Sequence, residues 1–254
     1  MAGREFSRAT FVVLLSTAAV PSARADVSDR IARVVSIPPG TPVSVQITIG
    51  DVVVNGWDRD DVSIEIVRHA ADARQLALIQ AQVEQGADGL IVRTVQADGG
   101  HDGRLRTDVV LHVPTMAQLR DIGVFEGSIE LSDLRGRCSA RLERGNIVGT
   151  RLSGAVRLET AIGNIRLAGA MLAADGFMRL RTFNGDVAIE LARTPEHARI
   201  LALSMGGHIT SDIPLTLKQQ WGPRFGEATL GRGEPVVSID VVNGNVAITV
   251  AGAR

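Results

Sequence analysis

Cysteine, lysine and large aromatic side chains are all scarce in this chain of 254 residues. There is no tyrosine, aromatic residues make up 3%, and Cys138 is the single cysteine. One cysteine cannot form an internal disulfide, so packing and hydrogen bonds must hold the fold together. Lysine occurs once, at Lys218, among 27 basic residues, and the formal net charge is −1. This near-neutral balance argues against nucleic acid as a partner, because such proteins need a clustered excess of basic charge.

Long hydrophobic runs are also missing, and the apolar run near the start of the chain is short. It extends from Phe11 to Val20, after Arg4 and Arg8 and before Ala23-Arg24-Ala25. A basic start, a short apolar stretch and small residues two apart are typical of a secretory signal peptide, whereas a membrane span needs about 20 apolar residues. We expect residues 1–25 to be a signal peptide, with an anchoring or disordered N-terminus as the alternative. The mature chain is then periplasmic or secreted to the cell surface, with no transmembrane segment.

Glycine, by contrast, is abundant at 27 residues, and it marks an internal repeat. At seven places a glycine follows an alternating segment and precedes a polar and then a β-branched residue. Glycine tolerates positive φ, and Asn or Asp bonds its own backbone, so each site predicts a tight corner. The sites are Gly50-Asp51-Val52, Gly127-Ser128-Ile129, Gly145-Asn146-Ile147, Gly163-Asn164-Ile165, Gly185-Asp186-Val187, Gly207-His208-Ile209 and Gly244-Asn245-Val246.

Alternating residues before each glycine predict a strand with one apolar face. The second strand of each unit alternates in the same way, as in Ile165 and Leu167 or Val187 and Ile189. One unit of about 20 residues cannot bury its apolar face alone, but stacked copies can. Ordinary hairpins of a β-sandwich are the alternative. The inward residues are Val43, Val45, Ile47; Cys138, Ala140, Leu142; Val156, Leu158, Thr160; Met178, Leu180, Thr182; Ile200, Ala202, Ser204; and Val237, Ile239, Val241.

The predicted fold is therefore all-β, a β-solenoid of stacked strand-turn-strand repeats. Residues 26–254 form one repetitive domain, with an N-terminal part at 34–114 and a repeat stack at 115–250. The alanine-rich stretch 70–78 predicts a short helix in the N-terminal part. Exposed end strands make a homo-oligomer a possible assembly.

At this point the pattern resembles a known family. The segment from Val45 to Val52 (VQITIGDV), then Pro114, then several Asn/Asp-Gly corners and the closing segment 231–246 are similar to the bacterial putative-adhesin domain of unknown function, also called toastrack-like. The likeness covers roughly residues 35–250. It implies a right-angled stack of strands in an extracytoplasmic protein, and it supplies no catalytic residue. The insertion 212–225 and the Gly206-Gly207-His208 corner depart from the family pattern.

No catalytic motif is recognisable, so no catalytic, cofactor-binding or metal-binding residue is assigned, and we expect no cofactor and no enzymatic activity. The five histidines lack metal-ligand spacing. Asp58, Asp60 and Asp61 form the densest acidic cluster and are interpreted as a solvated turn. Cys138 lies in an inward slot and is interpreted as a small buried thiol, with a reactive thiol as the alternative.

Arginines on the outward positions are the most suggestive feature. Arg157 and Arg179 share one outward column, and Arg141 and Arg181 lie alongside. Guanidinium groups bind carboxylates and phosphates in bidentate fashion, so such a row predicts an acidic polysaccharide or a lipid head group as partner. Codon bias and a solvated face are the alternative. Glu159 between Arg141 and Arg181 is the one candidate catalytic constellation, and its spacing is that of a surface ladder.

Trp221 and Phe225 lie in the Pro/Gly-rich insertion. They are either contact residues for an envelope protein or part of a hydrophobic lid on the last coils. The leading hypothesis is an exported, non-enzymatic binding scaffold of the cell envelope. The alternatives are an envelope-stress sensing module and, further off, a polysaccharide-acting β-helix enzyme.

Overall fold

The computed structural model describes residues 27–96, 105–218 and 222–252, and most of them lie in strands. The predicted signal peptide and Trp221 are outside the described residues. The described part contains one short helix, α1 (Ala73–Leu76), and 18 strands. The strands are β1 (Val27–Ser36), β2 (Pro42–Trp57), β3 (Asp61–Ala70), β4 (Ile79–Gly86), β5 (Gly89–Gln96), β6 (Arg106–Pro114), β7 (Gln118–Ser132), β8 (Cys138–Thr150), β9 (Ala155–Ile162), β10 (Ile165–Ala170), β11 (Phe177–Asn184), β12 (Val187–Leu191), β13 (Ala198–Ser204), β14 (Ile209–Ser211), β15 (Thr216–Lys218), β16 (Arg224–Leu230), β17 (Val236–Asn243) and β18 (Val246–Val250).

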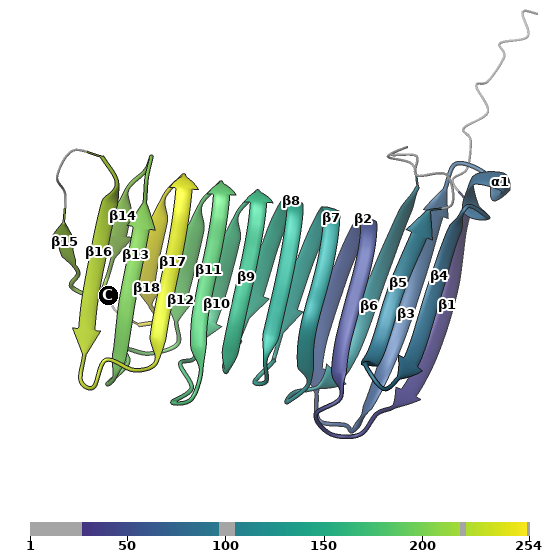
Figure 1. Ribbon diagram of the computed structural model, residues 1–254, viewed down its shortest axis with the longest axis horizontal. Helices are drawn as coiled ribbons and strands as arrows, with labels where there is room; N and C mark the ends of the chain where they lie inside the picture. The colour runs from purple at the N-terminus through teal and green to yellow at the C-terminus, as the bar shows by residue number, and fades with distance from the viewer. Residues whose placement is uncertain (1–26, 97–104, 219–221, 253–254) are drawn as a thin grey trace, which may run out of the picture.

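The strands stack into a long solenoid with a front and a rear layer (Figure 1). The front sheet runs β4-β5-β2-β7-β8-β9-β11-β17-β13-β16-β15, and the rear sheet runs β1-β3-β6-β2-β7-β8-β10-β12-β18-β14. The long strands β2, β7 and β8 belong to both, because each bends at its glycine and passes from the front to the rear. The all-β, stacked-repeat prediction is therefore confirmed.

The stack does not follow the order of the chain. The last unit, β17 and β18, lies between β11–β12 and β13–β14 and is parallel to both. The chain reaches this place because β16 runs back antiparallel along the outer edge of β13. The insertion expected as a loop at 212–225 thus contributes β15 and the start of β16, and it covers the end of the front sheet.

The glycine corners are confirmed, because at each one a side chain would collide with the backbone of the adjacent rung, which is another corner at every site except Gly50. A Cβ built on Gly163 would lie 1.7 Å from the carbonyl oxygen of Gly145, and the φ of Gly163 is +146°. The same contact at 1.9 Å joins Gly207 to Gly244, which follows the order of the stack and not that of the chain. Glycine is therefore required where adjacent rungs approach most closely.

Asx side chains hold successive corners in register. The Oδ1 atom of Asn146 accepts the backbone N–H of Asn164 at 2.9 Å, and Asn164 does the same for Asp186 at 2.8 Å. Asp186 in turn accepts from Asn245 at 2.7 Å. The Asn or Asp that follows five of the seven glycines therefore bridges to the next rung.

The inward residues predicted from the alternation are all buried. They belong to one hydrophobic cluster that extends from Ile37 to Val250, through both parts of the chain. Two inward hydroxyls are satisfied across rungs, since Thr182 donates to the Gly163 carbonyl at 2.9 Å and Ser204 to the Gly244 carbonyl at 2.8 Å. Buried polar groups need such partners.

The predicted helix at 70–78 is shorter than expected. It occupies only Ala73–Leu76, and the Asp72 side chain caps it by accepting the backbone N–H groups of Arg74 and Gln75. Its flanks are strands because Ala70 and Ile79 are buried against Leu105.

Candidate binding face

Outward side chains of the front sheet form straight columns across the rungs. Arg157 on β9 is the register partner of Arg179 on β11, so these two guanidinium stems lie one rung apart, about 4.8 Å. In the next column Arg141, Glu159 and Arg181 follow one another on β8, β9 and β11. The structure therefore brings together the four arginines that the sequence analysis singled out.

The second column alternates in sign. Arg141 Nε lies 3.7 Å from Glu159 Oε2, and Asp240 on β17 is the register partner of Arg181. Arg141, Glu159 and Arg181 border a shallow hollow of about 240 Å³ on the front surface. This geometry is that of the surface ladder that the spacing of Glu159 indicates.

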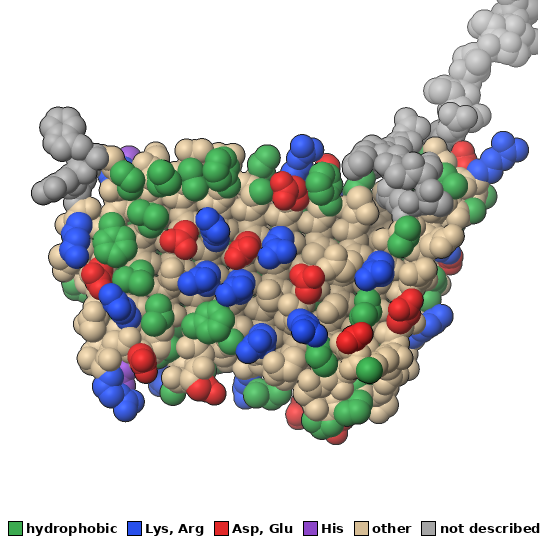
Figure 2. Space-filling model, viewed as in Figure 1, with side chains coloured by type: hydrophobic (Ala, Val, Ile, Leu, Met, Phe, Trp, Pro, Cys, Tyr) green, Lys and Arg blue, Asp and Glu red, His purple; other side chains and the backbone are tan. Residues whose placement is uncertain are grey.

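A second hollow, of about 370 Å³, concentrates basic charge. Arg120, Arg137 and Arg157 line it together with Phe177, which is 38% exposed. Arg179 is the next member of the Arg157 column. We call Arg120, Arg137, Arg157 and Arg179 the arginine patch. Figure 2 shows blue side chains gathered over the middle of this face.

Arg120 joins this patch because of a bulge in β7. The pairing of β7 with β8 slips between Leu119 and Ile122, so Arg120 and Asp121 both escape the inward alternation. Asp121 accepts a hydrogen bond from Gln46 Nε2 at 2.6 Å. Sequence reasoning missed Arg120 and Arg137, since one lies in a bulge and the other just before a strand.

Within the residues that the structure describes, no carboxylate lies within ion-pair distance of the arginine patch. Other arginines do have such partners: Arg30, Arg59, Arg68, Arg106, Arg141, Arg151 and Arg199. Like charges on adjacent rungs repel one another, so an anion placed between them relieves repulsion and gains charge-assisted hydrogen bonds. The arrangement therefore favours an anionic ligand.

Beside the arginine patch the same face becomes apolar. The outward positions of β13 are Arg199, Leu201 and Leu203, and Met205 follows just beyond the strand; Leu203 is the register partner of Phe225 on β16. Phe183 on β11 is 55% exposed and Met205 is 53% exposed. We call Leu201, Leu203, Met205, Phe183 and Phe225 the apolar patch. Phe225 therefore lies on a strand, beside Leu203, and not in the loop that the sequence predicts. The Nζ atom of Lys218 lies 5.9 Å from the centre of the Phe225 ring.

The rear sheet is different. From β7 to β14 its described strands carry one outward arginine, Arg166, among mostly small or polar side chains such as Ala188, Ala247 and Thr249. From β7 to β14 the two faces of the solenoid are therefore chemically distinct, with arginine concentrated on the front. The rear strands β1, β3 and β6 also carry arginines, but Arg30, Arg68 and Arg106 there are paired with carboxylates.

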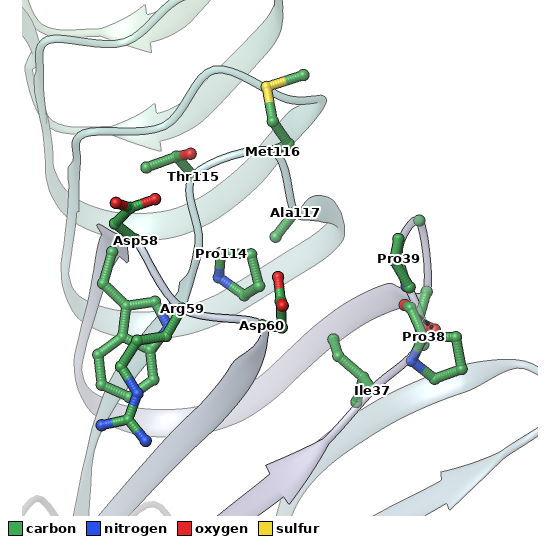
Figure 3. Close-up of a pocket in the computed structure, with 13 residues that line it drawn as sticks. Ile37, Pro38, Pro39, Asp58, Arg59, Asp60, Pro114, Thr115, Met116 and Ala117 are labelled. Carbon is green, nitrogen blue, oxygen red and sulfur yellow. Dashed lines mark hydrogen bonds between the residues drawn. The ribbon is translucent and has the colours of Figure 1, made fainter.

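A cleft of about 350 Å³ lies at the lower loops, between residues 37–41, 57–60 and 114–117. Figure 3 shows Asp60 between Pro114 and Ile37, with Arg59 lying against a ring outside the cleft centre. That ring is Trp57, with the Arg59 guanidinium 4.4 Å from its centroid, and Arg59 also pairs with Asp61. The interpretation of these aspartates as a turn agrees with this geometry. The cleft itself was missed because three separate loops form it.

Cys138 is fully enclosed. It is 1% exposed, and burial raises the pKa of its thiol to about 12. The thiol is therefore protonated at neutral pH, which fits a packing role and not a reactive one. Among the described residues no cluster of three or more His, Cys, Asp or Glu side chains is placed to hold a metal ion.

Comparisons with known proteins found solved structures that are similar to this chain at low sequence identity. No family model matches the sequence, and no curated protein matches it. A "putative cell adhesion protein" from Clostridium sporogenes is 8% identical, covers 87% of this chain and all of its own, and has a TM-score of 0.44. A "putative adhesin" from Bacteroides fragilis is 12% identical over 87% of this chain and 97% of its own, with a TM-score of 0.41. A "putative lipid binding protein" from Parabacteroides distasonis is 11% identical over 88% and 97%, with a TM-score of 0.33.

Proteins described as adhesins are thus among the solved structures similar to this chain. In the part of the chain that the structure describes, no helix has the length and apolar character needed to cross a bilayer. Because the identities are low and each TM-score is below 0.5, we derive the function from this chain's own side chains.

Proposed function

We propose that this protein is an exported, non-enzymatic binding scaffold of the cell envelope, and that its front sheet binds an anionic component. The observation that carries the proposal is the arginine patch. Three arginines line a hollow and Arg179 lies on the next rung, and the described structure supplies none of the four with a carboxylate partner. A protein that used these side chains only for solubility would not need them concentrated on one face.

The rigidity of the platform supports static recognition. Each rung is fixed to its neighbours by backbone ladders, by glycine contacts and by Asx bridges, so the guanidinium stems keep their spacing without a ligand. Preorganisation of this kind reduces the ordering cost of binding. The scaffold role requires no turnover, and Glu159 is already held by Arg141.

Export is supported by the N-terminal sequence. The basic start, short apolar run and Ala23-Arg24-Ala25 site predict cleavage before Asp26, and the mature chain would then reach the periplasm or the cell surface. Anionic polymers and anionic lipids are both available in these compartments.

The test is the double variant Arg157→Ala/Arg179→Ala, assayed for binding to cell-wall and lipid fractions. We expect a loss of about tenfold or more in affinity and a weaker salt dependence, because two charge-assisted contacts are removed. Arg166→Ala on the rear sheet is the matched control and should bind as the wild type does. Unchanged binding by the double variant would refute a role for the arginine patch.

A further inference from the structure

The arginine patch and the apolar patch are adjacent on one open face. Arg179 and Phe183 lie on the same strand, β11, four residues apart and both outward. On the next strand, β17, Asp240 is the register partner of both Arg181 and Leu203, so one rung separates the basic column from β13. Any ligand large enough to cover the face meets guanidinium groups and large apolar side chains together. Figure 2 shows green side chains gathered beside the blue ones on this face.

The outward side of β13 begins with Arg199, which pairs with Glu227, and continues with Leu201 and Leu203; Met205 follows just beyond the end of the strand. Outward positions of a strand whose outer face is in solvent are normally polar. Ser139 and Ser238, which lie in the same column as Arg157 and Arg179, are examples. Phe225 on one side and Phe183 on the other extend this patch. Phe183 and Met205 are exposed, whereas Leu201, Leu203 and Phe225 are half-buried. Apolar surface that is rimmed by polar and charged residues marks an interaction site.

The chemistry of the combined face matches an anionic membrane surface. Phosphate groups suit bidentate guanidinium contacts, and the acyl boundary just below them suits Leu, Met and Phe side chains. Sugar hydroxyls would instead need hydrogen-bonding side chains, which the apolar patch does not offer. The apolar side chains project from a sheet surface and do not line an enclosed cavity, so they can enter a bilayer boundary but cannot enclose one lipid molecule.

We propose that the front sheet docks this protein onto an anionic lipid bilayer, with the arginine patch at the head groups and the apolar patch at the acyl boundary. This inference rests on the proposed function and names its ligand. Neither patch alone is sufficient for stable membrane binding. Each basic residue near an anionic membrane raises the binding affinity only modestly, and the apolar patch is small.

The experiment is co-sedimentation of the mature protein with vesicles of phosphatidylglycerol and phosphatidylcholine, and with vesicles of phosphatidylcholine alone. The wild type should bind only the first. Arg157→Ala/Arg179→Ala should weaken that binding about 20-fold, at about fivefold for each arginine. Leu203→Ser/Met205→Ser should weaken it about tenfold, because apolar area no longer enters the interface. Circular dichroism verifies that each variant is folded.

Matched controls come from the rear sheet. Val148→Ser removes an exposed apolar side chain there, and Arg166→Ala removes an arginine, so both should bind vesicles as the wild type does. A second ligand, soluble polygalacturonate, separates charge recognition from membrane docking. Leu203→Ser/Met205→Ser should retain binding to polygalacturonate, because its arginine patch is intact.

Two results overturn the membrane inference and leave the proposed function standing. One is binding to polygalacturonate through the arginines without binding to vesicles, and the other is vesicle binding that Leu203→Ser/Met205→Ser does not weaken. Equal binding to vesicles with and without phosphatidylglycerol also overturns it, because charge then plays no part. If the wild type binds neither vesicles, polygalacturonate nor envelope fractions, the proposed function itself fails.

Discussion

Replacing Gly163 by alanine tests the central physical feature of the stack. The new Cβ would lie 1.7 Å from the Gly145 carbonyl oxygen, while real Cβ contacts stay above 3.0 Å, so the two rungs must separate by more than 1 Å. Such a shift breaks the contacts that join these corners. Two of them are Ile147 N–H to the Asn164 carbonyl at 2.9 Å and Asn164 N–H to Asn146 Oδ1 at 2.9 Å.

The expected loss of stability is the sum of the lost hydrogen bonds and the backbone strain. Two hydrogen bonds are together worth about 2 kcal/mol, and an alanine at a φ of +146° adds about 1 to 2 kcal/mol of backbone strain. We therefore expect Gly163→Ala to lower the free energy of unfolding by about 3 to 4 kcal/mol. Urea unfolding followed by circular dichroism and by tryptophan fluorescence measures it, and agreement of the two probes shows whether the stack unfolds as one unit.

Two other glycines provide the controls. Gly169 has a φ of +62°, but its Cβ would meet nothing closer than Arg151 Cγ at 3.6 Å, so Gly169→Ala isolates the backbone strain. Gly86 has neither a positive φ in the left-handed range nor any atom within 4 Å, so Gly86→Ala should leave stability nearly unchanged. If Gly163→Ala costs no more than Gly169→Ala, contact between corners is not what requires glycine.

Three further predictions concern single side chains. Thr182→Val removes the hydroxyl that satisfies the Gly163 carbonyl and should cost about 1 kcal/mol in urea unfolding, whereas Thr210→Val, at an exposed position, should cost less. Because burial raises the pKa of Cys138 from 9.0 to about 12, the folded state favours the protonated thiol; that stability is fully present below pH 9 and is lost as the pH rises toward 12. Denaturation of the wild type and of Cys138→Ala over this range measures the difference, and native Cys138 should resist a thiol reagent that labels it rapidly in urea. The hydrogen bond from Arg151 lowers the pKa of the Asp133 carboxyl, so Arg151→Ala should raise that pKa in an NMR titration; an unchanged titration would show that the pair does not form in solution.

Local pattern was sufficient to predict much of this protein. Every predicted corner is a corner, because glycine followed by a polar and a β-branched residue recurs at the same place in each unit, although the need for glycine comes from contact with the adjacent rung. The inward residues are buried for the same reason, since alternation along a strand decides which side chains face the interior. The Arg157 and Arg179 column was also predictable, because equal distances from successive glycines place residues in register.

Other features exist only in the folded molecule. Nothing in the periodicity places β17 between β11 and β13, because the choice of neighbour depends on contacts between strands far apart in the chain. Long-range contacts also produce three other features: the bulge that turns Arg120 outward, the strand that holds Phe225, and the cleft formed by three loops. The sequence by itself therefore determined which side chains point in and where each rung bends. Tertiary structure decided which rungs are adjacent, and with them the arginine and apolar patches that form one surface, because long-range pairing is not encoded in any single repeat.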